Sequence, residues 1–230
     1  MSKKSFIILF SFMFIMVLCN TKVFASESDS VHINQNSVST RQISFEEMVQ
    51  KYLQHTDTLK VNGNNGIDLT DPFISILNSN VSNKNYNAIR DYMNNYVESV
   101  YFRDVEEIKY ANARASYVSK YVQDYATKMI TNGDNARGYI IITVGGNITY
   151  NRNTGQITNA YNPKVVNVEY ADLAWWTMTP TNIQASARIS SDKYTAYFTG
   201  SVRSYGVHDD ATYLKFDFGT ASVTITATGD

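Results

Sequence analysis

The chain has 230 residues, of which 43% are hydrophobic and 18% are charged, and its 20 basic side chains nearly balance its 21 acidic ones. A chain of this length can bury a core as one large domain or two small ones. A net charge this close to zero argues against a protein that holds nucleic acid or anionic lipid by general electrostatic attraction.

Residues 1–25 have the pattern of a secretory signal peptide. Two lysines precede an apolar run over residues 6–18, and small or aliphatic residues lead to a cleavage site after Ala25. The apolar run is shorter than the roughly 20 residues that a transmembrane helix needs, although an uncleaved anchor is an alternative. We expect a secreted protein that begins at Ser26, and its signal segment resembles those of exported proteins of Gram-positive bacteria as a broad class.

The only cysteine, Cys19, lies inside this segment, so we expect no disulfide in the mature protein. A lipoprotein would use Cys19 as its lipidated residue, but Leu18 before it is bulkier than that signal requires. Removal of the three lysines of the signal peptide leaves 17 basic against 21 acidic side chains, a net charge of −4. Residues 27–135 carry the excess, with 14 acidic and 10 basic side chains.

The first predicted helix follows a polar lead-in. Residues 26–41 are rich in Ser, Asn and Asp and offer little to bury, so we predict a disordered segment there. Ser44 and Glu47 have the spacing of a capping box, and apolar residues follow at helical period. A helix is therefore expected to begin at Phe45.

The segment 61–71 is rich in Asn, Gly and Asp, which predicts a loop. An oxygen-rich calcium loop is an alternative, but the terminal Glu and the acidic spacing of an EF-hand are missing. Asp71 and Pro72 then have the pattern of an N-cap and a first helical residue, so a short helix is expected through Leu77.

Residues 83–133 form the longest stretch of helical period. Apolar residues of both halves of this stretch fall on one half of a helix surface. The apolar stripe is interrupted at Arg103, Asp104 and Glu107, and Asp104 with Glu107 has capping-box spacing. We predict two helices with a corner near residues 102–104, because one helix of about 47 residues would be far longer than average. One long projecting helix and dimerisation through residues 83–133 are the alternatives.

After residue 136 the pattern becomes that of β-strands. Residues 139–144 are apolar on both faces, and Gly145 with Gly146 predicts the end of that strand. A hairpin is expected around the turn at 153–155. In the last segment the apolar positions change parity, which predicts a bulge or turn at Gly219 and Thr220.

These patterns predict an α+β fold. An N-terminal helical region, residues 42–132, would be followed by an antiparallel β region, residues 137–230, folded as a sandwich or a strongly curved sheet.

Few residues offer catalytic or metal chemistry. The mature chain has no cysteine, which excludes thiol catalysis, and no hydrolase or nucleotide motif occurs. His208, Asp209 and Asp210, joined by Asp217, could hold a divalent metal, but their position between two strands is also typical of a turn. The other histidines, His32 and His55, are far away in sequence, so we expect no metal and no cofactor.

Two further features are candidate binding or catalytic sites. Asp104, Glu106, Glu107 and Glu169 could supply the paired carboxylates of a glycosidase, but a solvated helical surface explains the first three equally well. Trp175 and Trp176 would face opposite sides of a strand, so one can be buried while the other is exposed to a sugar or a membrane interface.

From these observations we expect a secreted, non-enzymatic interaction protein that acts at or outside the cell envelope on a protein or cell-wall ligand. The alternatives are a bacteriocin-like or toxin-like protein that acts on target membranes and, third, a metal-dependent or glycosidic enzyme. The candidate binding surface comprises seven residues: Trp175, Trp176, Arg103, Asp104, Glu107, His208 and Asp209.

Overall fold

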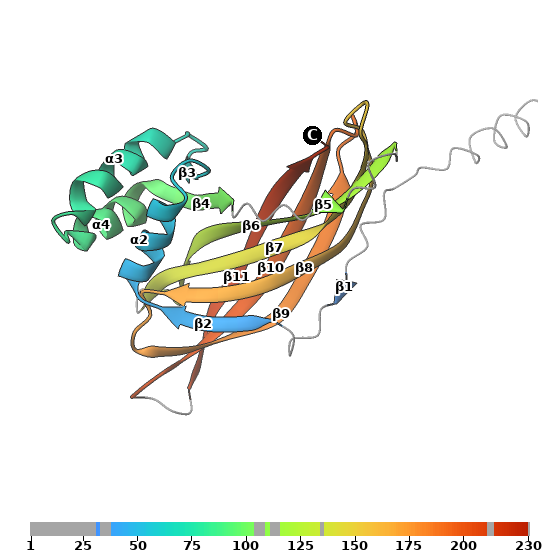
Figure 1. Ribbon diagram of the computed structural model, residues 1–230. Coiled ribbons are helices and arrows are strands. Elements are labelled where there is room, and N and C mark those ends of the chain that lie inside the picture. The colour runs from blue at the N-terminus through green and yellow to red at the C-terminus, as the bar shows by residue number, and fades with distance from the viewer. Residues whose placement is uncertain are drawn as a thin grey trace, which may run out of the picture.

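The computed structural model describes residues 31–32, 38–103, 109–110, 116–133, 136–210 and 214–229, and the predicted signal peptide lies outside them. This part of the chain is mostly β, with three helices and two sheets (Figure 1). The helices are α2 (Phe45–Gln54), α3 (Thr70–Val81) and α4 (Tyr86–Tyr96). The strands are β1 (Val31–His32), β2 (Ser39–Ile43), β3 (Lys60–Gly63), β4 (Val97–Arg103), β5 (Lys109–Tyr110), β6 (Tyr117–Thr131), β7 (Arg137–Asn151), β8 (Ile157–Ala171), β9 (Trp176–Ile189), β10 (Thr195–His208) and β11 (Lys215–Thr228).

The strands form a larger and a smaller sheet. The larger sheet has the order β2-β8-β7-β6-β4-β3, with β5 also paired to β6, and the smaller sheet has the order β1-β9-β10-β11. The described strands of the predicted β region, residues 137–230, pair with one another antiparallel, as expected. The larger sheet as a whole is mixed, because β2 from outside that region pairs with β8 in parallel. A parallel pair needs a long crossover, and the whole helical region together with β3 to β7 lies between these two strands in sequence.

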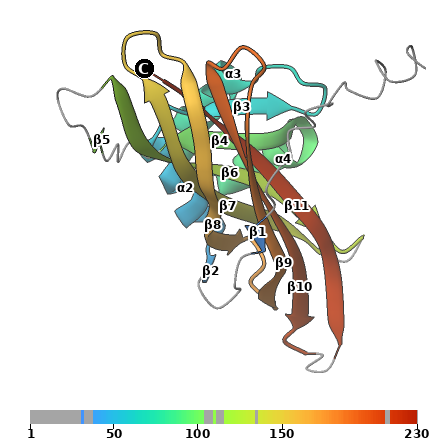
Figure 2. The same cartoon turned by 90° about the vertical axis from the view of Figure 1, so that its right-hand side faces the viewer.

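The elements stack in three layers. The helices cover one face of the larger sheet at one end, and the smaller sheet packs against its other face (Figures 1 and 2). Strand β7 lies between both cores: Ile140 and Ile142 point to the smaller sheet, while Tyr139 and Ile141 point to the helices. All four are at most 3% exposed, so the predicted burial of this strand on both faces is confirmed.

The start of α2 is confirmed as the sequence predicts. Ser44 is the N-cap, and its Oγ accepts a hydrogen bond from the backbone N–H of Glu47 at 3.0 Å. The buried side of the helix includes Phe45 and Tyr52. The Tyr52 hydroxyl donates to Thr127 Oγ1 at 2.9 Å, which links α2 to β6.

The segment 61–71 is only partly a loop, because its first residues belong to β3 and pair with β4. Helix α3 begins at Thr70, one residue before Asp71, which is therefore not its N-cap. Instead, Asp68 Oδ1 accepts from the backbone N–H of Thr70 at 2.9 Å, and hydrogen bonding to Thr70 lowers the pKa of the Asp68 carboxyl.

The prediction of two helices over residues 83–133 is wrong beyond Tyr96. Only α4 forms there, and from Val97 onwards the described residues belong mainly to β4, β5 and β6. Strand β6 has apolar residues on both faces: Ala126 and Ile130 face the smaller sheet, while Tyr125 faces the helices. Apolar residues on both faces of a strand can recur three and four positions apart, which imitates the helical period.

Part of the predicted disordered lead-in belongs to strands. Residues 39–41 belong to β2, and residues 31–32 form β1 on the edge of β9. These residues are therefore not a disordered segment, and the rest of 26–41, apart from Val38, lies outside the described part of the chain.

The short strands expected after residue 136 are joined into long ones. Strand β7 continues through Gly145 and Gly146, so the predicted end at this pair is wrong. The glycines are required by close packing instead. A Cβ on Gly146 would lie 2.2 Å from Phe198 Cε1, and one on Gly145 would lie 2.2 Å from the Tyr121 hydroxyl.

Two backbone irregularities appear where the sequence predicts them. Gly155 has φ +70° in the turn between β7 and β8, as a left-handed hairpin position requires. In β11 the register with β10 shifts between the pairs Arg203–Thr220 and Tyr205–Asp217, and Gly219 has φ +79°. The predicted bulge at Gly219 is therefore confirmed.

Candidate functional site

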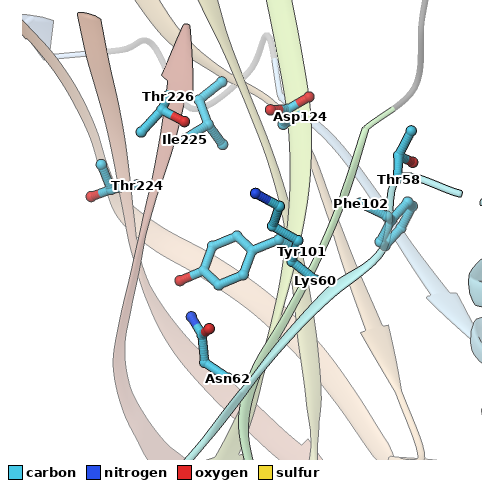
Figure 3. A pocket seen from close by; sticks show the side chains of 9 residues that line it. All are labelled: Thr58, Lys60, Asn62, Tyr101, Phe102, Asp124, Thr224, Ile225 and Thr226. Carbon is cyan, nitrogen blue, oxygen red and sulfur yellow. The ribbon is translucent and has the colours of Figure 1, made fainter. Parts of the chain in front are cut away.

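A pocket opens where β11 of the smaller sheet passes the β3–β4 edge of the larger sheet. It has a volume of about 450 Å³, and we call it the β11 pocket (Figure 3). It is lined by Thr58, Lys60, Asn62, Tyr101, Phe102, Asp124, Thr224, Ile225 and Thr226. These residues come from four segments that are far apart in sequence, so the pocket exists only in the folded chain.

Strand alternation places the polar side chains of β3 in this pocket. Lys60 and Asn62 are exposed, whereas Val61 between them is fully buried in the helical core. The backbone N–H of Val61 donates to Thr70 Oγ1 at 3.0 Å, which ties β3 to the start of α3. The buried valine thus holds Lys60 and Asn62 at the mouth of the pocket.

Alternation on β4 separates two aromatic residues. Phe102 stacks on Tyr125 with ring centroids 5.0 Å apart and planes 2° apart, and it also stacks on His55 at 5.3 Å. Tyr101 packs against the core between the sheets, and its hydroxyl points toward β11 (Figure 3). The phenol ring therefore forms one wall of the pocket, with the polar end of Asn62 beside it.

The lining offers an aromatic face, one ammonium group, one carboxylate, one amide and three threonine hydroxyls. This set can hydrogen-bond to a hydroxyl-rich ligand while the tyrosine ring contacts its apolar face. The described lining contains no histidine or cysteine and one carboxylate, that of Asp124, whereas a glycosidase canonically uses two.

Four of the seven predicted site residues meet at one end of the smaller sheet. Trp176 and His208 are register partners on β9 and β10, and their rings lie edge to face at 4.9 Å. The backbone N–H of Asp209 donates to the carbonyl of Trp175 at 3.0 Å. We call the end formed by Trp175, Trp176, His208 and Asp209 the tryptophan end.

The two tryptophans have different environments. Trp176 is 9% exposed and packs edge to face against Phe216 and Phe218, each at 5.2 Å, as well as against His208. Trp175 is 69% exposed. Trp176 therefore belongs to the core, and Trp175 is available to a partner.

The other predicted site residues do not join this end. Arg103 is the last residue of β4, in register with Asp124 and on the larger sheet, while Asp104 and Glu107 lie outside the described residues. Asp217 pairs with Arg203 instead of His208, and this hydrogen bond holds the pKa of the Asp217 carboxyl below its usual range.

The contacts of His208 are those of a turn. The backbone N–H of Asp210 donates to His208 Nδ1 at 3.3 Å, and the Asp210 carboxylate lies 3.9 Å from the same nitrogen. Among the residues that the structure describes, no three His, Cys, Asp or Glu side chains are close enough to hold a metal ion.

Glu169 faces the helical layer, away from the tryptophan end. It is 4% exposed, forms an ion pair with Lys51 of α2, and lies 3.8 Å from Arg41 Nε. The enzyme alternative requires Glu169 to share a pocket with His208 or Asp209, and the described residues do not bring them together.

Sequence reasoning missed the β11 pocket entirely. Lys60, Asn62 and Tyr101 carry no motif, and only the pairing of β3 with β4 brings them to one edge. The alternation of polar and apolar residues at 60–63 was the available signal, but the glycines and asparagines that follow obscured it.

No family model, no curated protein and no solved structure matches this chain. None of the helices in the described ranges is long and apolar enough to cross a membrane.

Proposed function

We propose that this chain is a secreted, non-enzymatic binding protein that acts outside the cell and takes a hydroxyl-rich ligand, such as a cell-wall saccharide, in the β11 pocket. The observation that supports the proposal is the lining of that pocket, in which the Tyr101 ring stands beside the Asn62 amide and the Lys60 ammonium group. Aromatic faces next to amide and hydroxyl groups suit sugar rings, which present both apolar faces and hydroxyls.

The test is co-sedimentation of the mature protein, beginning at Ser26, with purified insoluble Gram-positive peptidoglycan that retains its wall polysaccharide. The double variant Lys60→Ala, Asn62→Ala should bind about 30-fold more weakly, because each lost hydrogen bond is worth about 1 kcal/mol. The matched control removes the same two side-chain types elsewhere: Lys215→Ala with Asn78→Ala, two exposed residues outside the pocket.

Equal retention of the pocket variant and the wild type on peptidoglycan, or an equal loss in the control pair, would contradict the proposal. Tyr101→Phe separates the two parts of the lining: it keeps the ring and removes only the hydroxyl, so it should weaken binding less than the double variant.

A second candidate function is supported by the tryptophan end. Trp175 is 69% exposed, and Leu214 just before β11 is 61% exposed. Exposed Trp and Leu suit insertion into a membrane interface, as a toxin-like protein requires. However, Asp209 lies beside Trp175, to whose carbonyl its backbone N–H donates, and the Asp209 carboxylate repels anionic lipid.

Vesicles of anionic and zwitterionic lipid discriminate between the two candidates. A membrane-acting protein should release a trapped dye at micromolar concentration and lose this activity on Trp175→Ala, whereas Tyr194→Ala, an exposed aromatic at the opposite end of β9 and β10, should have no effect. Absence of release would argue against the membrane-acting candidate and leave the binding proposal standing.

A further inference from the structure

A second cleft lies at the opposite side of the sandwich, between β8 of the larger sheet and β9 of the smaller one. Its volume is about 920 Å³, and we call it the β8–β9 cleft. It is lined by residues 156–163 of β8 and its preceding turn, and by residues 187–191 and Lys193 of β9 and its following turn. It shares no residue with the β11 pocket.

The cleft exposes the edges of two strands. Strand β8 pairs with β7 along its length, but on its other side β2 covers only residues 167–171. Strand β9 pairs with β10, and on its other side β1 pairs only with residues 184 and 185. Among the described residues, β8 from 157 to 166 and β9 from 186 to 189 therefore have no neighbouring strand on the side of the cleft. Edge strands of this kind present backbone N–H and C=O groups that can pair with another chain.

Both ends of the cleft are closed. At one end the backbone N–H of Ile157 donates to the carbonyl of Lys193 at 2.7 Å. At the other end β2 pairs with β8 from Asn167 onwards, and β1 pairs with Gln184 and Ala185 of β9. The cleft is thus a gap of limited length in a wall of strands.

The free edge of β8 is short. Its first residue, Ile157, already donates to Lys193, and the edge is interrupted again at Asn162, which has φ +51°. Pro163 after it has no N–H to donate. The continuous free edge is therefore residues 158–161, and at about 3.3 Å per residue it offers about 13 Å of backbone, enough for a short added strand.

The charge of the lining favours one kind of peptide. The described lining contains Arg188 and Lys193 and no carboxylate. Arg188 is exposed, and its guanidinium carbon lies 4.0 Å from the centroid of the Tyr197 ring, which belongs to the neighbouring strand β10. The Asp192 carboxylate accepts a hydrogen bond from Ser190 of the lining, so the two cations leave one net positive charge beside the exposed strand edges. This charge favours an extended segment that carries Asp or Glu.

We propose that the β8–β9 cleft binds an extended acidic peptide segment of another protein, which adds to the free edge of β8 as a strand. Backbone hydrogen bonds to residues 158–161 hold the peptide, and Arg188 and Lys193 select its acidic side chains. This site would act independently of the β11 pocket.

The test uses a fluorescein-labelled decapeptide of alternating Thr and Glu with blocked ends, titrated against the mature protein by fluorescence anisotropy at low salt. The matching Thr–Lys peptide should bind at least tenfold more weakly if charge selects the ligand. The Thr–Glu peptide methylated on every backbone nitrogen should also bind at least tenfold more weakly, because it cannot donate to a strand edge.

The protein variants test the location. Arg188→Glu with Lys193→Glu should weaken binding of the Thr–Glu peptide at least tenfold, while the control pair Arg137→Glu with Lys84→Glu, exposed and outside the cleft, should not. Lys84 is matched to Lys193 because both have a positive φ, 54° and 66°. In the wild type, hydrogen exchange of those amides within 158–161 that point away from β7 should slow when the peptide is added.

Equal binding of the Thr–Lys or the methylated peptide would overturn the proposal, as would an equal loss in the control pair. Slow exchange of the same outward amides in the free protein would overturn it too, because the cleft would already be filled. The mass of the protein in solution would then identify the occupant. A monomer would indicate this chain's own N-terminal residues, and a dimer would indicate a second copy of the chain.

Discussion

Substitution of Gly146 by alanine tests the packing between the two sheets. The added Cβ would lie 2.2 Å from Phe198 Cε1 and 2.5 Å from Cδ1, and Phe198 is fully buried in the core between the sheets. Overpacking of this kind costs about 1–3 kcal/mol, and the closeness of two ring atoms places Gly146→Ala near the upper limit, about 3 kcal/mol. At about 2–4 °C per kcal/mol for a chain of this size, Tm should fall by about 6–12 °C.

Urea unfolding provides the free energy, followed by far-UV circular dichroism and by the fluorescence of buried Trp176. The control is Gly145→Ala, whose Cβ would meet the hydroxyl end of Tyr121 at 2.2 Å. Because Tyr121 is only partly buried, its side chain can move, and the loss of stability should be smaller.

A shorter side chain at position 198 should relieve the clash. Phe198→Leu alone leaves a cavity and destabilises the protein, but in the Gly146→Ala background the same change should cost at least about 1 kcal/mol less. A Gly146→Ala protein with the wild-type urea midpoint, or strictly additive effects in the double variant, would refute the packing argument.

Three further predictions concern polar groups that are buried or half-buried. Burial raises the pKa of Tyr170 to about 12, against about 10 in the unfolded chain, so the stability that the neutral phenol contributes is complete below pH 10 and is lost as the pH rises to 12. In the Tyr170→Phe variant the free energy of unfolding should therefore fall less steeply between pH 10 and 12, by about 1.4 kcal/mol per pH unit. An unchanged slope in urea titrations over this pH range would contradict this. Lys51→Met removes the ion-pair partner of buried Glu169 and should destabilise the fold by about 2–3 kcal/mol. The double variant Lys51→Met with Glu169→Met should recover most of that loss in the same urea assay. A double variant no more stable than Lys51→Met would argue against an ion-pair effect. Arg90 donates to both oxygens of Asp172, at 2.7 and 3.0 Å, and its guanidinium carbon lies 4.4 Å from the Phe45 ring centroid. Arg90→Lys keeps the charge but loses this planar geometry, so it should lower the free energy of unfolding by about 1 kcal/mol. A change in Tm below about 1 °C would show that the planar geometry is unimportant.

Local chemistry made some elements predictable. The capping box of Ser44 and Glu47 fixed the start of α2, because it depends only on residues three positions apart. Likewise, the change of parity around Gly219 required an irregularity in β11 whatever the rest of the fold, and the register shift lies there.

The error over residues 97–131 has a different origin. Strand β6 is covered by the helices on one face and by the smaller sheet on the other, so its apolar residues do not alternate. Its many Tyr, Val and Thr residues favour a strand, but the apparent helical period of the same residues favours a helix. Only the tertiary context decides between the two.

The candidate sites depend on long-range pairing and were therefore less accessible to sequence reasoning. Trp175, Trp176, His208 and Asp209 meet because β9 and β10 are adjacent strands of a hairpin. In contrast, the β11 pocket joins β3 and β4 to the last strand of the chain. The sequence around Lys60 and Asn62 does not predict that β11 lies next to them.

The parallel pairing of β2 with β8 has a consequence for the order in which the protein folds. The hydrogen bond from Gln42 to Leu173 joins residues 131 positions apart, and the Lys51–Glu169 contact spans 118 positions. Contacts of such long range form slowly, because a large loop must close before any of them stabilises the chain. If the chain is exported N-terminus first, as the proposed signal peptide requires, it must expose β2 and α2 without their partner until β8 has emerged, and its central core closes late in export.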